Sequence, residues 1–170
     1  MSFGNAPNEL MAGAKNAVEV CLGVQPGEKV LVVADEISCS VAASLEKALK
    51  VCGAEFTGLL LEDFSPRPIT VAPEPVLDAL ERTDVGVLCM TPQPGELSAR
   101  MAIVRVVERR QIRYAHMVGV TPEIMQQGMR ADYRKVDELS DRLRDRMLRS
   151  YEHKDGGREN HWDEQFHRTL

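Results

Sequence analysis

Four residues of this sequence lie at or just after the ends of predicted strands: Asp35, Glu36, Thr91 and Thr121. Parallel α/β sheets bind ligands beyond the carboxyl ends of their strands, so these four are our candidate ligand-binding residues. The two acids could hold a ribose hydroxyl or a cation. The alternative is that they only end a strand and place negative charge at the start of the next helix, where the helix dipole favours it. No residue is assigned a catalytic role.

The histidines near the C-terminus are candidates for binding a metal: His153, His161 and His167. The last two are separated by six positions, so they do not share a helix face as the two histidines of an HExxH motif do. We therefore expect no native metal site and no cofactor in this chain. A divalent metal is expected only if a partner supplies the site.

Three motifs of nucleotide or nucleophile chemistry are missing from the sequence. Residues 35–40, at the end of the strand predicted at 29–35 and after it, contain no glycine. The dinucleotide fingerprint GxGxxG is therefore absent. No GxxxxGK followed by Ser or Thr occurs, and no GxSxG nucleophile elbow occurs. These absences argue against an NAD-dependent or α/β-hydrolase enzyme.

The most basic segment of the chain is 100–113, which is rich in arginine. It could meet a phosphate or an acidic partner, but such a run is more often the solvated face of a helix. Nothing aromatic interleaves with the arginines, which argues against single-stranded nucleic acid. His116 falls inside a predicted strand with no second ligand nearby, and we interpret it as structural.

Composition places the chain among ordinary globular proteins. It has 170 residues and a formal net charge of −5, so it has no global attraction to phosphate, and we expect neither nucleic-acid nor membrane partners. No apolar run reaches the roughly 18 residues of a membrane helix, and the first residues do not resemble a secretory signal. The four cysteines form no CxxC pair, which predicts reduced, buried, structural thiols in a cytoplasmic protein.

Short apolar runs alternate with helical patterns along the chain. The predicted strands are residues 29–35, 56–61, 85–90 and 114–119, and the predicted helices are 8–23, 38–53, 76–82 and 97–110. A last helical system begins with Thr121 as its N-cap. The alternation predicts an α/β fold with three layers, in which helices flank a mostly parallel sheet of about four strands in the order 2-1-3-4.

Three segments carry more specific expectations. The helix 97–110 is expected to bury an apolar face, which is formed by Leu97, Met101, Val104 and Val107. The stretch 64–75 holds four prolines and predicts an extended surface loop that serves as a lid or an interface. In the last helix, apolar residues step by three and four and predict one buried seam, which is formed by Val136, Leu139, Leu143 and Met147. We expect a domain at 1–150 and a polar, aromatic tail at 151–170.

Several segments of the sequence resemble the leucyl aminopeptidase family of the aminopeptidase T type. The stretch 14–35, AKNAVEVCLGVQPGEKVLVVAD, looks like the opening of these proteins. MVGVTPEIM at 117–125, followed by MRADY at 129–133, resembles a second family segment, with Val118 where the family has proline. LSAR at 97–100 stands where the family often has a Ser-His-Thr segment. The resemblance covers roughly residues 10–148.

The resemblance implies an α/β amino-terminal domain. The family holds two metal ions with Glu, His and Asp residues of a carboxyl-terminal domain, and no position here matches one of those ligands. The leading hypothesis is therefore a stand-alone, aminopeptidase-like domain without catalysis of its own. It would serve interaction or assembly, as a homo-oligomer or beside a separate catalytic chain.

Two alternatives remain at this point. The chain could be a subunit of a metal-dependent aminopeptidase, or of a related ring-cleaving dioxygenase, whose metal site a partner supplies. It could also be a flavodoxin-like domain that binds a small ligand. A ligand of that kind would stabilise the folded chain measurably.

Overall fold

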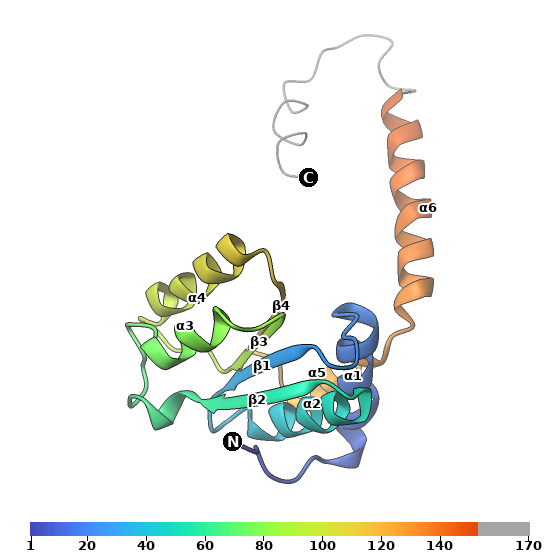
Figure 1. Cartoon of the computed structure of the whole chain (residues 1–170). Helices are drawn as coiled ribbons and strands as arrows, with labels where there is room; N and C mark the ends of the chain where they lie inside the picture. Colours follow the sequence, from blue (N-terminus) through green and yellow to red (C-terminus); the bar gives the residue numbers. More distant parts are fainter. Residues whose placement is uncertain (153–170) are drawn as a thin grey trace. The chain divides into compact units, whose positions relative to one another are not determined.

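The structure, a computed structural model, describes residues 1–152 and divides the chain into two compact units between Ala131 and Asp132. Unit 1, residues 1–131, is a sheet with helices on both faces (Figure 1). The described part of unit 2 is a single helix. The predicted division into residues 1–150 and a tail at 151–170 stays a prediction, because residues 153–170 lie outside the described part.

The sheet has four parallel strands in the order β2-β1-β3-β4. The strands are β1 (Lys29–Ala34), β2 (Glu55–Leu60), β3 (Val85–Met90) and β4 (Arg113–Val118). This confirms the α/β class and the predicted strand order. The register aligns the strand ends, since Ala34 of β1 pairs with both Leu60 of β2 and Cys89 of β3.

Helices cover both faces of the sheet, as predicted (Figure 1). One face is covered by α1 (Met11–Asn16), α2 (Cys39–Cys52) and α5 (Pro122–Gln126), and the other by α3 (Glu74–Leu80) and α4 (Leu97–Arg110). Strand β1 alternates between the two layers: Val30 and Val32 join one buried cluster, while Leu31 and Val33 join the other. Because both faces are buried, the strand reads as a continuous apolar run.

The buried face of α4 differs in part from the predicted one, of which Val107 is buried and Val104 half-buried. Leu97 and Met101 are 61% and 44% exposed, whereas the helix buries Ala99, Ile103, Val106 and Val107. Both sets step by three and four residues, so spacing alone does not separate them. The small side chain of Ala99 faces the sheet and permits close packing there, which leaves the bulkier Leu97 outside.

No disulfide bond joins the four cysteines, which all lie within residues 1–152, but they are not all buried as expected. Cys89 in the central strand β3 is buried, Cys39 and Cys52 are half-buried, and Cys21 is exposed. Cys21 ends a single π-helical turn, Ala17–Cys21, on its solvent side. Apolar neighbours in the sequence therefore did not decide which side of the helix this thiol occupies.

The first helix contacts the last segment of unit 1 backbone to backbone. A Cβ atom on Gly13 of α1 would lie 2.3 Å from the carbonyl oxygen of Met125, so only glycine fits there. The side-chain amide of Asn16 donates hydrogen bonds to the carbonyl oxygens of Met129 (3.0 Å) and Ala131 (2.7 Å). These contacts join the two ends of unit 1.

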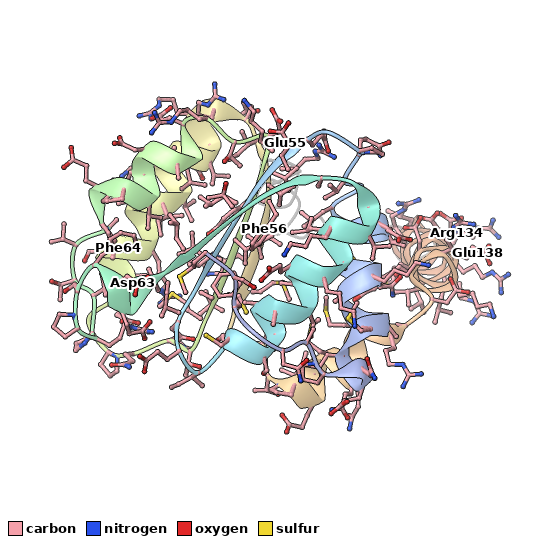
Figure 2. The ribbon with its side chains drawn as sticks, turned by 60° about the horizontal axis from the view of Figure 1, so that its bottom comes forward. Glu55, Phe56, Asp63, Phe64, Arg134 and Glu138 are labelled. Carbon is pink, nitrogen blue, oxygen red and sulfur yellow. The ribbon has the colours of Figure 1, made fainter. Side chains whose placement is uncertain are left out.

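Unit 2 begins with the 20-residue helix α6 (Tyr133–Glu152), whose predicted apolar seam is not buried. Val136, Leu139 and Leu143 are 46%, 57% and 52% exposed. Charged side chains project around the rest of the helix, where Figure 2 labels Arg134 and Glu138. None of the helices in residues 1–152 combines the length and apolar character that crossing a bilayer requires.

Candidate functional site

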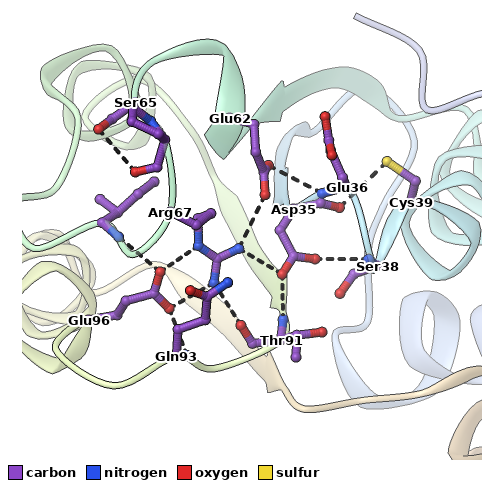
Figure 3. A network of polar contacts seen from close by, with 12 residues as sticks. Asp35, Glu36, Ser38, Cys39, Glu62, Ser65, Arg67, Thr91, Gln93 and Glu96 are labelled. Carbon is purple, nitrogen blue, oxygen red and sulfur yellow. Dashed lines mark hydrogen bonds and ion pairs between the residues drawn. The ribbon is translucent and has the colours of Figure 1, made fainter.

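The most elaborate polar site of unit 1 lies at the carboxyl ends of the strands (Figure 3). We call it the strand-end cluster, and its members are Asp35, Glu62, Arg67, Thr91 and Glu96. They come from five places in the chain: the ends of β1 and β3, the turn after β2, the proline-rich loop, and the residue before α4. Sheet register brings Asp35 and Thr91 together, because Ala34 at the end of β1 pairs with Cys89, one residue before the end of β3.

Asp35 follows β1 and is fully buried. One carboxylate oxygen accepts a hydrogen bond from the backbone N–H of Ser38 at 2.8 Å. The other accepts from the backbone N–H of Thr91 at 2.7 Å and from Arg67 Nη1 at 2.8 Å. The carboxylate thus ties the start of α2 to the end of β3, and its negative charge is balanced by an arginine.

Arg67 stands in the middle of the cluster and has a side chain that is only 7% exposed. Nη1 donates to Asp35 and to Glu62 (3.4 Å), and Nη2 donates to Glu96 and to the carbonyl oxygen of Thr91, both at 2.7 Å. Nε also donates to Glu96. A guanidinium has five N–H groups, so every one of them has an acceptor.

Glu96 accepts hydrogen bonds from Nε and Nη2 of Arg67 and is also fully buried. The backbone N–H groups of Ile69 and Gln93 each donate to it at 2.9 Å. Burial alone would raise the pKa of Glu96, but the hydrogen bonds from Arg67, Ile69 and Gln93 outweigh it and lower the pKa to about 2. The same contact with Glu96 raises the pKa of Arg67 despite burial. Both groups are therefore charged at neutral pH.

The loop that delivers Arg67 lies at the surface, as its prolines predicted, and it also places a few side chains inward. Most of its side chains are exposed, including Pro66, Pro68 and Val71, whereas Arg67 reaches into the cluster at the strand ends. Ile69 and Ala72 are buried in the cluster of apolar residues below α3 and α4. The loop therefore covers the edge at which a ligand was expected.

The structure unites three of the four sequence-predicted ligand residues, but not in the expected roles. Asp35 is the buried carboxylate just described, whereas Glu36 is exposed and joins through its backbone N–H, which donates to Glu62 at 3.2 Å. Thr91 contributes its backbone N–H and carbonyl. Thr121 caps α5 by accepting from the N–H of Ile124 and takes no part in the cluster.

Sequence reasoning missed Arg67 and Glu96, the pair at the centre of the cluster. Glu96 follows a Pro-Gly turn and precedes an amphipathic helix, so it looked like an ordinary residue of a helix start. A lone arginine between two prolines, two residues before the apolar Ile69, was the available signal. A charged side chain in a stretch that is otherwise apolar and proline-rich indicates a buried partner.

The cluster has little chemistry to offer as it stands. Its carboxylates are held by the cluster's own donors, and the neighbouring Cys39 thiol has a raised pKa because of burial and nearby acids, so it is not an activated nucleophile. Within residues 1–152, no group of three or more His, Cys, Asp or Glu side chains is arranged to hold a metal ion. His153, His161 and His167 lie outside the described residues.

No protein-family model matches this chain, and no curated protein matches it. Among solved structures, it is similar to wild-type AmpT from Thermus thermophilus, with 14% sequence identity and a TM-score of 0.44. The match covers 71% of this chain and 41% of that chain, so this chain spans less than half of that structure's length. A likeness of this size does not establish a shared family or activity, and the resemblance to the aminopeptidase family stays a prediction.

Proposed function

We propose that this chain contributes an aminopeptidase-like domain that does not catalyse and that serves assembly. The absence of catalysis is inferred from Arg67, whose guanidinium lies at the edge where parallel sheets bind ligands. Each of its N–H groups already has an acceptor within the protein. A ligand there would have to displace contacts between buried charges. Removing one partner of such a pair costs about 3–5 kcal/mol, and this cost would be subtracted from the binding free energy of any ligand that displaced it.

Hydrolysis of leucine-p-nitroanilide by the purified 170-residue chain tests this half of the proposal. The assay contains cobalt, zinc or manganese, an EDTA control, and a known metallo-aminopeptidase as the positive control. We expect no metal-dependent turnover above the blank. Turnover that EDTA abolishes would overturn the proposal, and replacement of His153, His161 and His167 would then locate the metal.

The assembly half is supported by α6, whose seam exposes about half of each apolar side chain. Lys135, Arg142 and Arg149 are spaced by seven and border the seam on one side, while Ser140 borders it on the other. An antiparallel second copy would place the basic border against itself. A parallel second copy would place it against the uncharged border, so we infer parallel pairing of two α6 helices.

Light scattering after size-exclusion chromatography measures this association. We expect a dimer that Leu143→Lys converts to a monomer, because a charge in the seam cannot be desolvated cheaply. Asp145→Lys adds positive charge on the opposite side of the helix and should leave the dimer intact. A monomeric wild-type chain would contradict the assembly half while leaving the hydrolysis result untouched.

A further inference from the structure

Two buried polar atoms of unit 1 have no hydrogen-bond partner among the described residues: Arg100 Nε and Tyr114 Oη. Arg100 lies on α4, and Tyr114 lies on β4, the strand that follows α4 along the chain. A buried donor without a partner costs about 1–3 kcal/mol, and native proteins contain few of them. Two such atoms in neighbouring elements therefore call for an explanation.

The tyrosine ring occupies a slot that the sheet provides. Gly86 of β3 pairs with Tyr114, and a Cβ atom on Gly86 would lie 3.1 Å from both the Tyr114 ring and the Leu80 side chain. The absent side chain at Gly86 thus makes room for the ring. Phenylalanine would fill the same slot without burying a hydroxyl, so packing explains the ring but not its oxygen.

Arg100 differs from Arg67, the other arginine of unit 1 that is not exposed. Arg67, Arg109, Arg110 and Arg113 each form an ion pair with a glutamate or aspartate. Arg100 is half-buried and forms no ion pair within residues 1–152. Its positive charge has no counterion from the described chain.

The surroundings of these two groups favour negative charge. His116 stands two residues after Tyr114, on the same face of β4, and the two ring centroids are 6.0 Å apart. Burial and then the Arg100 charge lower the pKa of His116, and no carboxylate contributes to the pKa of either His116 or Tyr114. Tyr114 packs against the same apolar cluster as the buried face of α4, so the helix that carries Arg100 and the two rings of β4 lie on one side of the sheet.

We propose that Arg100 and Tyr114 form a binding site for a compact oxyanion, a carboxylate or a phosphate, with His116 beside it. Arg100 would donate its Nε–H and a terminal N–H to two oxygens of the ligand, the paired geometry that guanidinium groups favour. Tyr114 would donate its hydroxyl proton to the same group. The site lies apart from the strand-end cluster and does not depend on the proposed assembly role.

Thermal unfolding of the full chain in sodium phosphate, sodium acetate or sodium chloride at one fixed ionic strength tests the site. A bound oxyanion stabilises the folded state by mass action, so we expect Tm to rise saturably, by about 2–4 °C, in phosphate or acetate relative to chloride. A rise in phosphate alone identifies a phosphate ligand, and a rise in acetate identifies a carboxylate.

Three variants localise the effect. Tyr114→Phe keeps the ring in its slot and should lose most of the rise, and Arg100→Gln should lose all of it. Arg105→Gln removes an exposed arginine from the same helix and should keep the full rise. The proposal is overturned if neither anion raises Tm of the wild-type chain, or if the rise persists in both Arg100→Gln and Tyr114→Phe. Because Tyr114→Phe preserves the packing, the test does not depend on Arg100→Gln folding.

Discussion

Arg67 and Arg100 lie against the same sheet and differ in what their guanidinium groups contact. Arg67 is almost fully buried, and each of its N–H groups has an acceptor within the cluster. Arg100 is half-buried, and its Nε is enclosed without an acceptor. Removing Arg67 would leave buried carboxylates without their cation, whereas the unpartnered Nε of Arg100 is the group that we propose to bind an oxyanion. The two arginines therefore differ in hydrogen-bond satisfaction, and this difference is the basis for assigning them different roles.

Removing the Arg67 side chain should produce the largest effect. Arg67→Ala leaves Asp35 and Glu96 buried without their cation, and we expect the free energy of unfolding to fall by about 3–5 kcal/mol in urea titrations. Arg109→Ala is the matched control, because Arg109 is 63% exposed and its ion pair with Glu81 is expected to contribute less than about 1 kcal/mol. Equal losses of unfolding free energy in the two variants would show that the buried Arg67 contributes no more than an exposed arginine.

Acid should weaken the chain through Glu96. Its folded pKa of about 2 lies below its ordinary value of 4.5, so its stabilising contribution is complete above pH 4.5 and is lost as pH falls towards 2. Glu96→Gln should abolish this part of the pH dependence, although the variant is less stable at pH 7. Urea titrations at pH 7, 4.5 and 3 measure it. Parallel pH profiles for wild type and variant would show that Glu96 does not titrate as described.

The Tyr114 hydroxyl should behave unlike a hydroxyl that has a partner. In chloride buffer, Tyr114→Phe should leave stability unchanged or raise it by up to about 1 kcal/mol, because it removes a buried oxygen without a bond. Thr83→Val should lower stability by about 0.5–1.5 kcal/mol, since the Thr83 hydroxyl donates to the carbonyl of Ala79 at 3.0 Å. A clear loss in Tyr114→Phe would mean that the hydroxyl already has a partner inside the protein.

The smallest effect is expected at Glu36. Its exposed carboxylate stands beside Asp35 in the sequence but outside the hydrogen bonds of the cluster, to which it contributes only its backbone N–H. Glu36→Gln should change the free energy of unfolding by less than about 0.5 kcal/mol. A larger loss in the free energy of unfolding, measured in the same urea titrations, would mean that the Glu36 side chain also stabilises the cluster.

The regular elements of the sheet were predictable because each depends on a local pattern. Strand β3 and helix α4 begin and end at the predicted residues, and the strand order followed from the usual doubly wound arrangement. The buried face of α4 was not predictable, since Ala99 and Leu97 lie on competing stripes of the same spacing. Tertiary packing, and not periodicity, determines which of the two stripes is buried.

The candidate site was predictable only in its location. Asp35 and Thr91 end paired strands, so their meeting follows from topology. Arg67 is 32 residues from Asp35 and 29 from Glu96 along the chain, and its place depends on how an irregular loop folds back. No local sequence pattern encodes such a contact, which exists only in the folded chain.

The contact between Gly13 and Met125, with the two hydrogen bonds of Asn16, has a consequence for how unit 1 forms during synthesis. Helix α1 is made first, yet its partners at Met125, Met129 and Ala131 are made more than 100 residues later. A single turn or two of helix is marginal in water without tertiary contacts. The contacts of the first helix with this segment therefore cannot form until the last residues of unit 1 have left the ribosome.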